Sequence, residues 1–210
     1  MIEAFQPKHE VKLTPQELVA DLIFDMPLEL ALQTDHAARK VHAALQPGIL
    51  PQGPIWVRSN LYWAKAGEAQ PWHTDFNRGQ RETPAQYLSK VKNRTIILFA
   101  YGEEDLNTDY LERPSLEEVL LLDVPFRIAD VNRHISQRTD LRIRSFGPQQ
   151  FLRFKPDIFH RRLTASTDHF RRIILFHDQE PLFESVKMNP LQKLTSNASR
   201  ERYKEIRRGA

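Results

Sequence analysis

The spacing of hydrophobic positions along this chain changes from helical to strand-like near residue 54. Residues 14–17 (Thr-Pro-Gln-Glu) predict a helix start, because a capping threonine, a proline at the first helical position and a capping-box glutamate occur together. Apolar residues at helical intervals predict one longer helix over residues 30–45. Over residues 54–64, apolar and polar residues alternate, which predicts a half-buried strand. We therefore expect N-terminal helices over residues 1–48.

Four further strands are expected, and they span residues 94–101, 141–146, 150–154 and 171–177. The first of these runs is apolar at nearly every position, which predicts burial on both faces. Helices followed by short strands favour a mainly β fold with N-terminal helices, either a β-sandwich or a jelly roll, over a parallel α/β fold. We expect a single domain over residues 1–210, with its β core at 54–178.

Two segments have a less regular pattern. Residues 102–138 are expected to form an insert in the core, with a short capped helix at 115–122. Such an insert is either a packed helical excursion or a lid that recognises substrate. Residues 180–210 form a polar, proline-containing tail, and its basic part at 199–208 is either a helix or disordered.

Composition narrows the chemistry without identifying it. The chain has 210 residues, of which 40% are hydrophobic and 27% charged, as in an ordinary globular protein. It contains no cysteine, which excludes disulfides, thiolate metal sites and cysteine nucleophiles. No signal peptide and no membrane-length apolar run is evident, so we expect a cytoplasmic protein without a membrane partner. The net charge is only +3, and we interpret the basic residues of 133–172 as a solvated surface rather than a nucleic-acid site.

The segment 70–76 (Gln-Pro-Trp-His-Thr-Asp-Phe) carries the strongest chemical signal. On an extended backbone, His73 and Asp75 project to the same face and could bind one metal ion together. His160 is the candidate third ligand, with His169 and His177 as alternatives to it. Two histidines and one carboxylate are typical of non-haem Fe(II) oxygenases. Taken alone, His-Thr-Asp is more often an ordinary surface loop.

The ordered set of a His-x-Asp pair, a distal histidine and an arginine eleven residues later resembles the Fe(II)/2-oxoglutarate-dependent dioxygenases over residues 55–176. The resemblance implies a double-stranded β-helix, which is a cupin-like jelly roll. It also implies that His73, Asp75 and His160 hold Fe(II), with 2-oxoglutarate as cosubstrate and O2 as oxidant.

The same resemblance implies which residues bind the cosubstrate. Arg171 would pair with the far carboxylate of 2-oxoglutarate, and Arg172 is the alternative because adjacent strand residues face opposite ways. Tyr62 and Arg94 are further candidates for contacts with the cosubstrate. The family often places a serine or threonine two residues after the arginine, and Ile173 stands there in this chain.

We therefore expect an oxygenase that hydroxylates or desaturates a C–H bond, in a small molecule such as an amino acid. A nucleic-acid or peptide substrate stays open. One alternative is a cupin-like metalloprotein of another reaction type, although the chain has only seven glycines. The other is a non-enzymatic binding module that uses the basic face. Hydrolases are disfavoured, because the sequence contains no Gly-x-Ser-x-Gly, His-Glu-x-x-His or P-loop motif.

Overall fold

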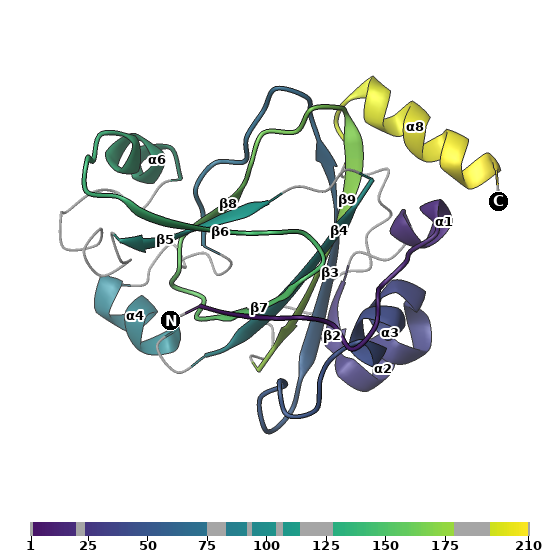
Figure 1. Ribbon diagram of the computed structural model, residues 1–210, viewed down its shortest axis with the longest axis horizontal. Helices are drawn as coiled ribbons and strands as arrows, with labels where there is room; N and C mark the ends of the chain where they lie inside the picture. The colour runs from purple at the N-terminus through teal and green to yellow at the C-terminus, as the bar shows by residue number, and fades with distance from the viewer. Residues whose placement is uncertain are drawn as a thin grey trace.

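The computed structural model describes residues 2–19, 24–74, 83–91, 94–103, 107–113, 128–178 and 194–209. Its helices lie on both outer sides of two facing β-sheets (Figure 1). The helices are α1 (Pro15–Leu18), α2 (Leu28–Thr34), α3 (His36–Ala43), α4 (Pro84–Val91), α6 (Ile128–Ser136) and α8 (Asn197–Arg208).

Six strands form the larger sheet, in the order β1-β7-β4-β9-β3-β2, and every neighbouring pair is antiparallel. They are β1 (Glu3–Phe5), β2 (Phe24–Pro27), β3 (Trp56–Ala64), β4 (Ile96–Gly102), β7 (Phe151–Phe154) and β9 (His169–His177). In the long β3–β9 pairing, Tyr62 lies opposite Arg171 and Arg58 lies opposite Leu175. Opposed residues project from the same face of a sheet, so this register decides which side chains share a site.

Three strands form the smaller sheet, in the order β6-β5-β8, and they are also antiparallel. They are β5 (Thr108–Arg113), β6 (Arg142–Phe146) and β8 (His160–Arg162). An isolated antiparallel bridge between His73 and His160 joins the 70–74 segment to β8.

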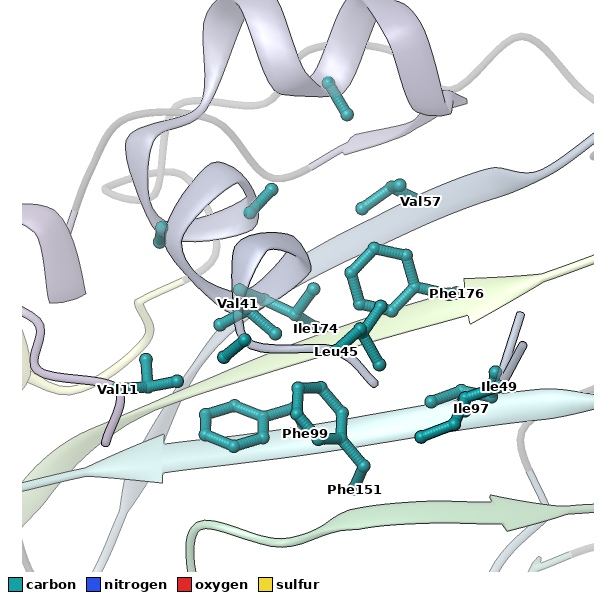
Figure 2. Close-up of a cluster of buried hydrophobic side chains, with 14 of the residues drawn as sticks. Val11, Val41, Leu45, Ile49, Val57, Ile97, Phe99, Phe151, Ile174 and Phe176 are labelled. Carbon is teal, nitrogen blue, oxygen red and sulfur yellow. The ribbon is translucent and has the colours of Figure 1, made fainter. Parts of the chain in front are cut away.

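A helical layer covers the outer face of the larger sheet. Val41 of α3 and the nearby Leu45 share one buried cluster with Val57, Phe99 and Phe176 of the strands beneath (Figure 2). Helices α1 and α8 extend this layer, since Leu18, Tyr203 and Ile206 pack in a second cluster with residues of β3 and β9. Burial of these apolar faces is the main force that attaches the helices to the sheet.

The inner faces of the two sheets form a second core. Leu98, Leu152 and Leu175 of the larger sheet pack with Tyr110 and Phe146 of the smaller one. Strand β4 is therefore buried on both faces, between the helical layer and the smaller sheet, as its nearly continuous apolar sequence predicts.

The outer face of the smaller sheet is covered in turn. Val91 of α4 and Ile135 of α6 form a buried cluster with Trp72, Leu111 and Phe159. The molecule therefore has four layers in section, with helices, a large sheet, a small sheet and helices (Figure 1).

The helix expected over residues 30–45 is two helices, because Asp35 separates α2 from α3. Asp35 has an extended backbone, and its Oδ1 accepts the N–H groups of Ala37 (2.8 Å) and Ala38 (3.2 Å) as an N-cap. A capping aspartate starts a new helix at this position, and the apolar periodicity on either side conceals the break. The capping box that starts α1 is confirmed.

The predicted insert at 102–138 also needs correction. Strand β5 lies within this segment and is the central strand of the smaller sheet, so an insert cannot begin before residue 114. The predicted helix at 115–122 lies outside the described residues. The strands expected near 54–64, 94–101, 141–146, 150–154 and 171–177 are confirmed as β3, β4, β6, β7 and β9.

Besides β5, three short strands were not predicted from the sequence. Strands β1 and β2 lie within the N-terminal segment that was expected to be helical, and β8 contains His160. In the tail, the basic segment expected at 199–208 is helix α8, which packs on the large sheet.

The fold is mainly β with N-terminal helices, as expected, and its two antiparallel sheets are consistent with a β-sandwich. None of the helices in the described part of the chain has the length and apolar content needed to cross a bilayer.

Candidate functional site

A cavity of about 520 Å³ lies between the inner faces of the two sheets. Strand β3 lines it with Arg58, Asn60 and Tyr62, and these residues alternate along one face of the strand as their sequence spacing predicts. Strand β9 adds residues beside them on the same sheet, and most of the remaining lining comes from the 65–74 segment and the smaller sheet. The volume lies within the usual range for small-molecule sites, about 300–1,000 Å³.

His73 and His160, far apart in the sequence, lie side by side at this cavity. His73 N donates to His160 O at 3.1 Å, and His160 N donates to His73 O at 2.9 Å. In such a hydrogen-bonded pair the two side chains project from the same face. Their ring centroids are 4.4 Å apart. The structure therefore brings together two of the three predicted metal ligands.

Backbone carbonyls fix the tautomer of both imidazoles. Nδ1 of His73 lies 2.9 Å from Pro71 O, and Nδ1 of His160 lies 3.2 Å from Ile158 O. A carbonyl oxygen only accepts, so each Nδ1 carries the proton and the neutral ring keeps its lone pair on Nε2. Metal-binding histidines are commonly oriented in this way. The ring of Tyr110 stacks on that of His160, with centroids 5.4 Å apart, and limits its rotation.

The third predicted ligand, Asp75, lies outside the described residues. Within the described ranges, no group of three histidines or carboxylates is close enough to hold a metal ion. Two adjacent imidazoles with Nε2 lone pairs fit the donor chemistry of a divalent transition metal such as Fe(II). A carboxylate two residues after His73 would complete the set expected from the sequence.

Of the other histidines considered as ligands, neither takes the place of His160. His169 and His177 both belong to β9 in the larger sheet. His177 Nε2 lies 2.9 Å from Asp25 Oδ1, and His169 Nδ1 lies 2.9 Å from Thr167 O. Only His160 is paired with His73 across a bridge among the described residues.

No protein-family model and no curated protein matches this chain.

Arg171 is a buried cation in the cavity wall. It is only 6% exposed, and its Nη2 donates to Thr108 Oγ1 at 2.9 Å. Burial is the main cause that lowers the pKa of Arg171 to about 10, while Tyr110 and Tyr62 oppose this shift and the nearby charge of Arg162 adds to it. Arg171 is still cationic at neutral pH, so the wall presents a guanidinium that suits a carboxylate.

Arg172 faces the opposite side of β9. Its Nη2 forms an ion pair of 2.9 Å with Asp35 Oδ2 in the helical layer, and both side chains are completely buried. Arg172 is thus excluded from the cavity by strand alternation, which leaves Arg171 as the arginine of this pair that faces the site.

Of the two remaining candidates for contacts with the cosubstrate, Tyr62 lines the cavity and Arg94 does not. Tyr62 lines the cavity and is 45% exposed, which places its ring at the mouth. Arg94 does not line the cavity, and its Nη1 donates to Asp178 O at 3.0 Å beyond the end of β9.

Sequence reasoning missed three residues of the site. Thr108 lies within the predicted insert, although its hydroxyl accepts a hydrogen bond from Arg171 Nη2. Arg162 follows His160 by two residues and shares its face, a spacing that could have identified it. Arg58 shares the alternating face of Tyr62, but only the structure reveals its buried partner, Asp25.

Proposed function

We propose that this chain is an Fe(II)/2-oxoglutarate-dependent oxygenase that hydroxylates or desaturates a C–H bond of a small molecule. The observation that carries the proposal is the placement of His73, His160 and Arg171 in one cavity. Two imidazoles with lone pairs on Nε2 are suited to bind a metal ion. A buried guanidinium is suited to bind the far carboxylate of a dicarboxylate.

The order of the strands supports the same proposal at the level of the fold. From β3 onward, the chain alternates between the two sheets. Strands β3 and β4 belong to the larger sheet, and the segment between them contains His73, which pairs with β8 of the smaller sheet. Strands β5 and β6 then belong to the smaller sheet, β7 to the larger, β8 to the smaller and β9 to the larger. We infer a double-stranded β-helix from this alternation.

Each side chain then has a defined part in the reaction. His73, His160 and Asp75 would hold Fe(II), which supplies open coordination positions where 2-oxoglutarate and O2 react. Arg171 would bind the far carboxylate of 2-oxoglutarate with two parallel hydrogen bonds. Thr108 orients that guanidinium through its 2.9 Å hydrogen bond. The sheets on either side exclude bulk water from the buried part of the cavity, which strengthens these charge interactions.

Anaerobic titration of the apo-protein with Fe(II) and then 2-oxoglutarate tests the proposal. Chelation of the keto acid to Fe(II) gives a weak charge-transfer band in the visible, and we expect this band in the wild type. His73→Ala and His160→Ala should lose it, because each removes one imidazole ligand. His36→Ala is the matched control, because His36 is exposed at the start of α3 and should leave the band unchanged.

The titration also separates the alternatives. Iron binding without the band would favour a cupin-like metalloprotein of another reaction type. A protein that binds no iron, or a His73→Ala/His160→Ala double variant that keeps the band, would refute the proposed site.

A further inference from the structure

The charged residues that line the cavity are mostly cations. Among the described lining residues, the acidic member is Glu68 and the basic ones are Arg58, Lys65, Arg162 and Arg171. Lys65 and Glu68 pair with each other at 2.9 Å, and both side chains are largely exposed at the rim. Their charges offset one another at the rim, so the remaining cationic groups of the lining are the guanidiniums of three arginines, of which Arg58 pairs with Asp25 at 2.7 Å. A cavity of this kind attracts anionic ligands.

These arginines belong to two separate regions of the cavity. Arg171 and Arg162 lie together, because Arg162 pairs in register with Thr108, whose Oγ1 accepts a hydrogen bond from Arg171 Nη2 at 2.9 Å. Arg58 lies on β3 four residues before Tyr62, the partner of Arg171 in register. At about 3.3 Å per residue, the two positions are about 13 Å apart along the strand. A single carboxylate cannot bridge this separation and bind both arginines.

The guanidinium of Arg58 also leans away from Arg171. Its Nε and Nη2 donate to Asp25 Oδ2 at 3.0 and 2.7 Å, and Asp25 belongs to β2, on the side of β3 opposite β9. The other oxygen of Asp25 contacts His177 Nε2 at 2.9 Å. Asp25 and His177 are nearly fully buried. This network holds Arg58 in one orientation before any ligand arrives, which lowers the entropic cost of binding.

Between the two cationic regions the wall is apolar. Ile173 lies there opposite Asn60, and Leu175 and Leu98 continue the apolar wall at the level of Arg58. The surface suits a short hydrocarbon body more than a sugar or a nucleobase, which would need more hydrogen-bonding partners.

We propose that the substrate is a small acid, whose anionic group pairs with Arg58 and whose aliphatic body lies on Leu98, Ile173 and Leu175. This inference rests on the proposed function, since it assigns Arg171 to the cosubstrate and Arg58 to the substrate. A carboxylate and a phosphate would be recognised through the same charge-assisted hydrogen bonds.

The test uses the protein loaded with Fe(II) and 2-oxoglutarate without O2. Three probes share one hydrocarbon chain and differ in the head group: hexanoate, hexyl phosphate and hexanamide. A probe that binds beside the metal changes the charge-transfer band, and its half-saturating concentration can be read from that change. We expect hexanoate or hexyl phosphate to act at a concentration about 10- to 100-fold lower than hexanamide, as for loss of one hydrogen bond to a charged group. Which of the two acids acts more strongly identifies the anion.

Arg58→Gln should remove this preference for an acid. Because that change leaves Asp25 buried beside His177, Asp25→Asn combined with Arg58→Gln serves as a second variant without the leftover charge. Arg153→Gln is the matched control, since Arg153 pairs with Glu3 at the surface of β7 and does not line the cavity.

Equal responses to the acids and the amide, including no response to any of them, would overturn the inference. So would an acid preference that persists in both Arg58 variants. In each case the intact band shows that the proposed function stands. Absence of the band with 2-oxoglutarate alone would overturn both, because the inference depends on the cosubstrate.

Discussion

Replacing Arg172 by methionine is the sharpest test of how β9 is held in the fold. The Arg172–Asp35 pair has a separation of 2.9 Å and side chains that are 0% and 1% exposed. Removal of one partner leaves the other charge buried, which typically costs about 3–5 kcal/mol. For a chain of this size each kcal/mol lowers Tm by about 2–4 °C, so we expect a decrease of about 6–20 °C. Urea unfolding followed by circular dichroism measures the loss at constant temperature.

A double-mutant cycle separates the charge from the cap. Asp35→Asn keeps an oxygen that can accept the N–H groups of Ala37 and Ala38, but it removes the charge. Adding Asp35→Asn to Arg172→Met should therefore recover a large part of the lost free energy of unfolding. Arg153→Met breaks an ion pair whose side chains are more than a third exposed, so it should cost less than about 1 kcal/mol.

Two results would refute this reasoning. The first is a loss below about 1 kcal/mol in Arg172→Met, which would mean that the pair is not a buried charge interaction. The second is additivity, in which Asp35→Asn lowers the free energy of unfolding by as much in the Arg172→Met variant as in the wild type.

Three further predictions follow from the site and from the buried carboxylates. Arg171→Gln should raise the half-saturating concentration of 2-oxoglutarate by about 10- to 100-fold. Arg161→Gln, on the outward face of β8 against Trp72, should leave it unchanged in the same titration. Burial raises the pKa of Asp157, so the folded state favours the protonated carboxyl, and stability is lost as pH rises from 3.8 through the higher folded pKa. The urea midpoint of Asp157→Asn should therefore be higher than that of the wild type at about pH 7 and equal to it near pH 3. Burial also opposes ionisation of Asp25, but the hydrogen bonds and charges of His177 and Arg58 together outweigh it and lower the pKa of this carboxyl. The contribution of Asp25 to stability is therefore present above 3.8 and lost as pH falls through the folded pKa, so Asp25→Asn should flatten the acid side of the stability profile.

Local signals in the sequence predicted the elements whose residues repeat a period. Strand β4 and strand β9 were predicted because their apolar runs are long, and α1 because its cap is encoded in four adjacent residues. Strand β8 has only three residues, and two of them are arginines, so no periodicity can identify it. Its strand character comes from pairing with β5 and with His73, which are distant in sequence.

The residues of the site were likewise predictable only where a local signal in the sequence marks them. His73 and His160 could be proposed from spacing, because metal chemistry restricts the residue types that take part. The contact between Thr108 and Arg171 joins two sheets and leaves no trace in spacing. The choice between Arg171 and Arg172 needed the register of β9, since the sequence states only that they face opposite ways.

The register of β9 affects both the stability of the fold and the residues that face the cavity. Strand β9 is paired on both sides, with β3 and with β4, so its position along the sheet is fixed by backbone bonds to two neighbours. A slip of one residue would move Arg172 into the cavity and Arg171 into the helical layer. Asp35 opposes the slip, because it accepts Arg172 at 2.9 Å while capping α3. A carboxylate in the helical layer therefore specifies, through an ion pair on the far face of the strand, which arginine faces His160.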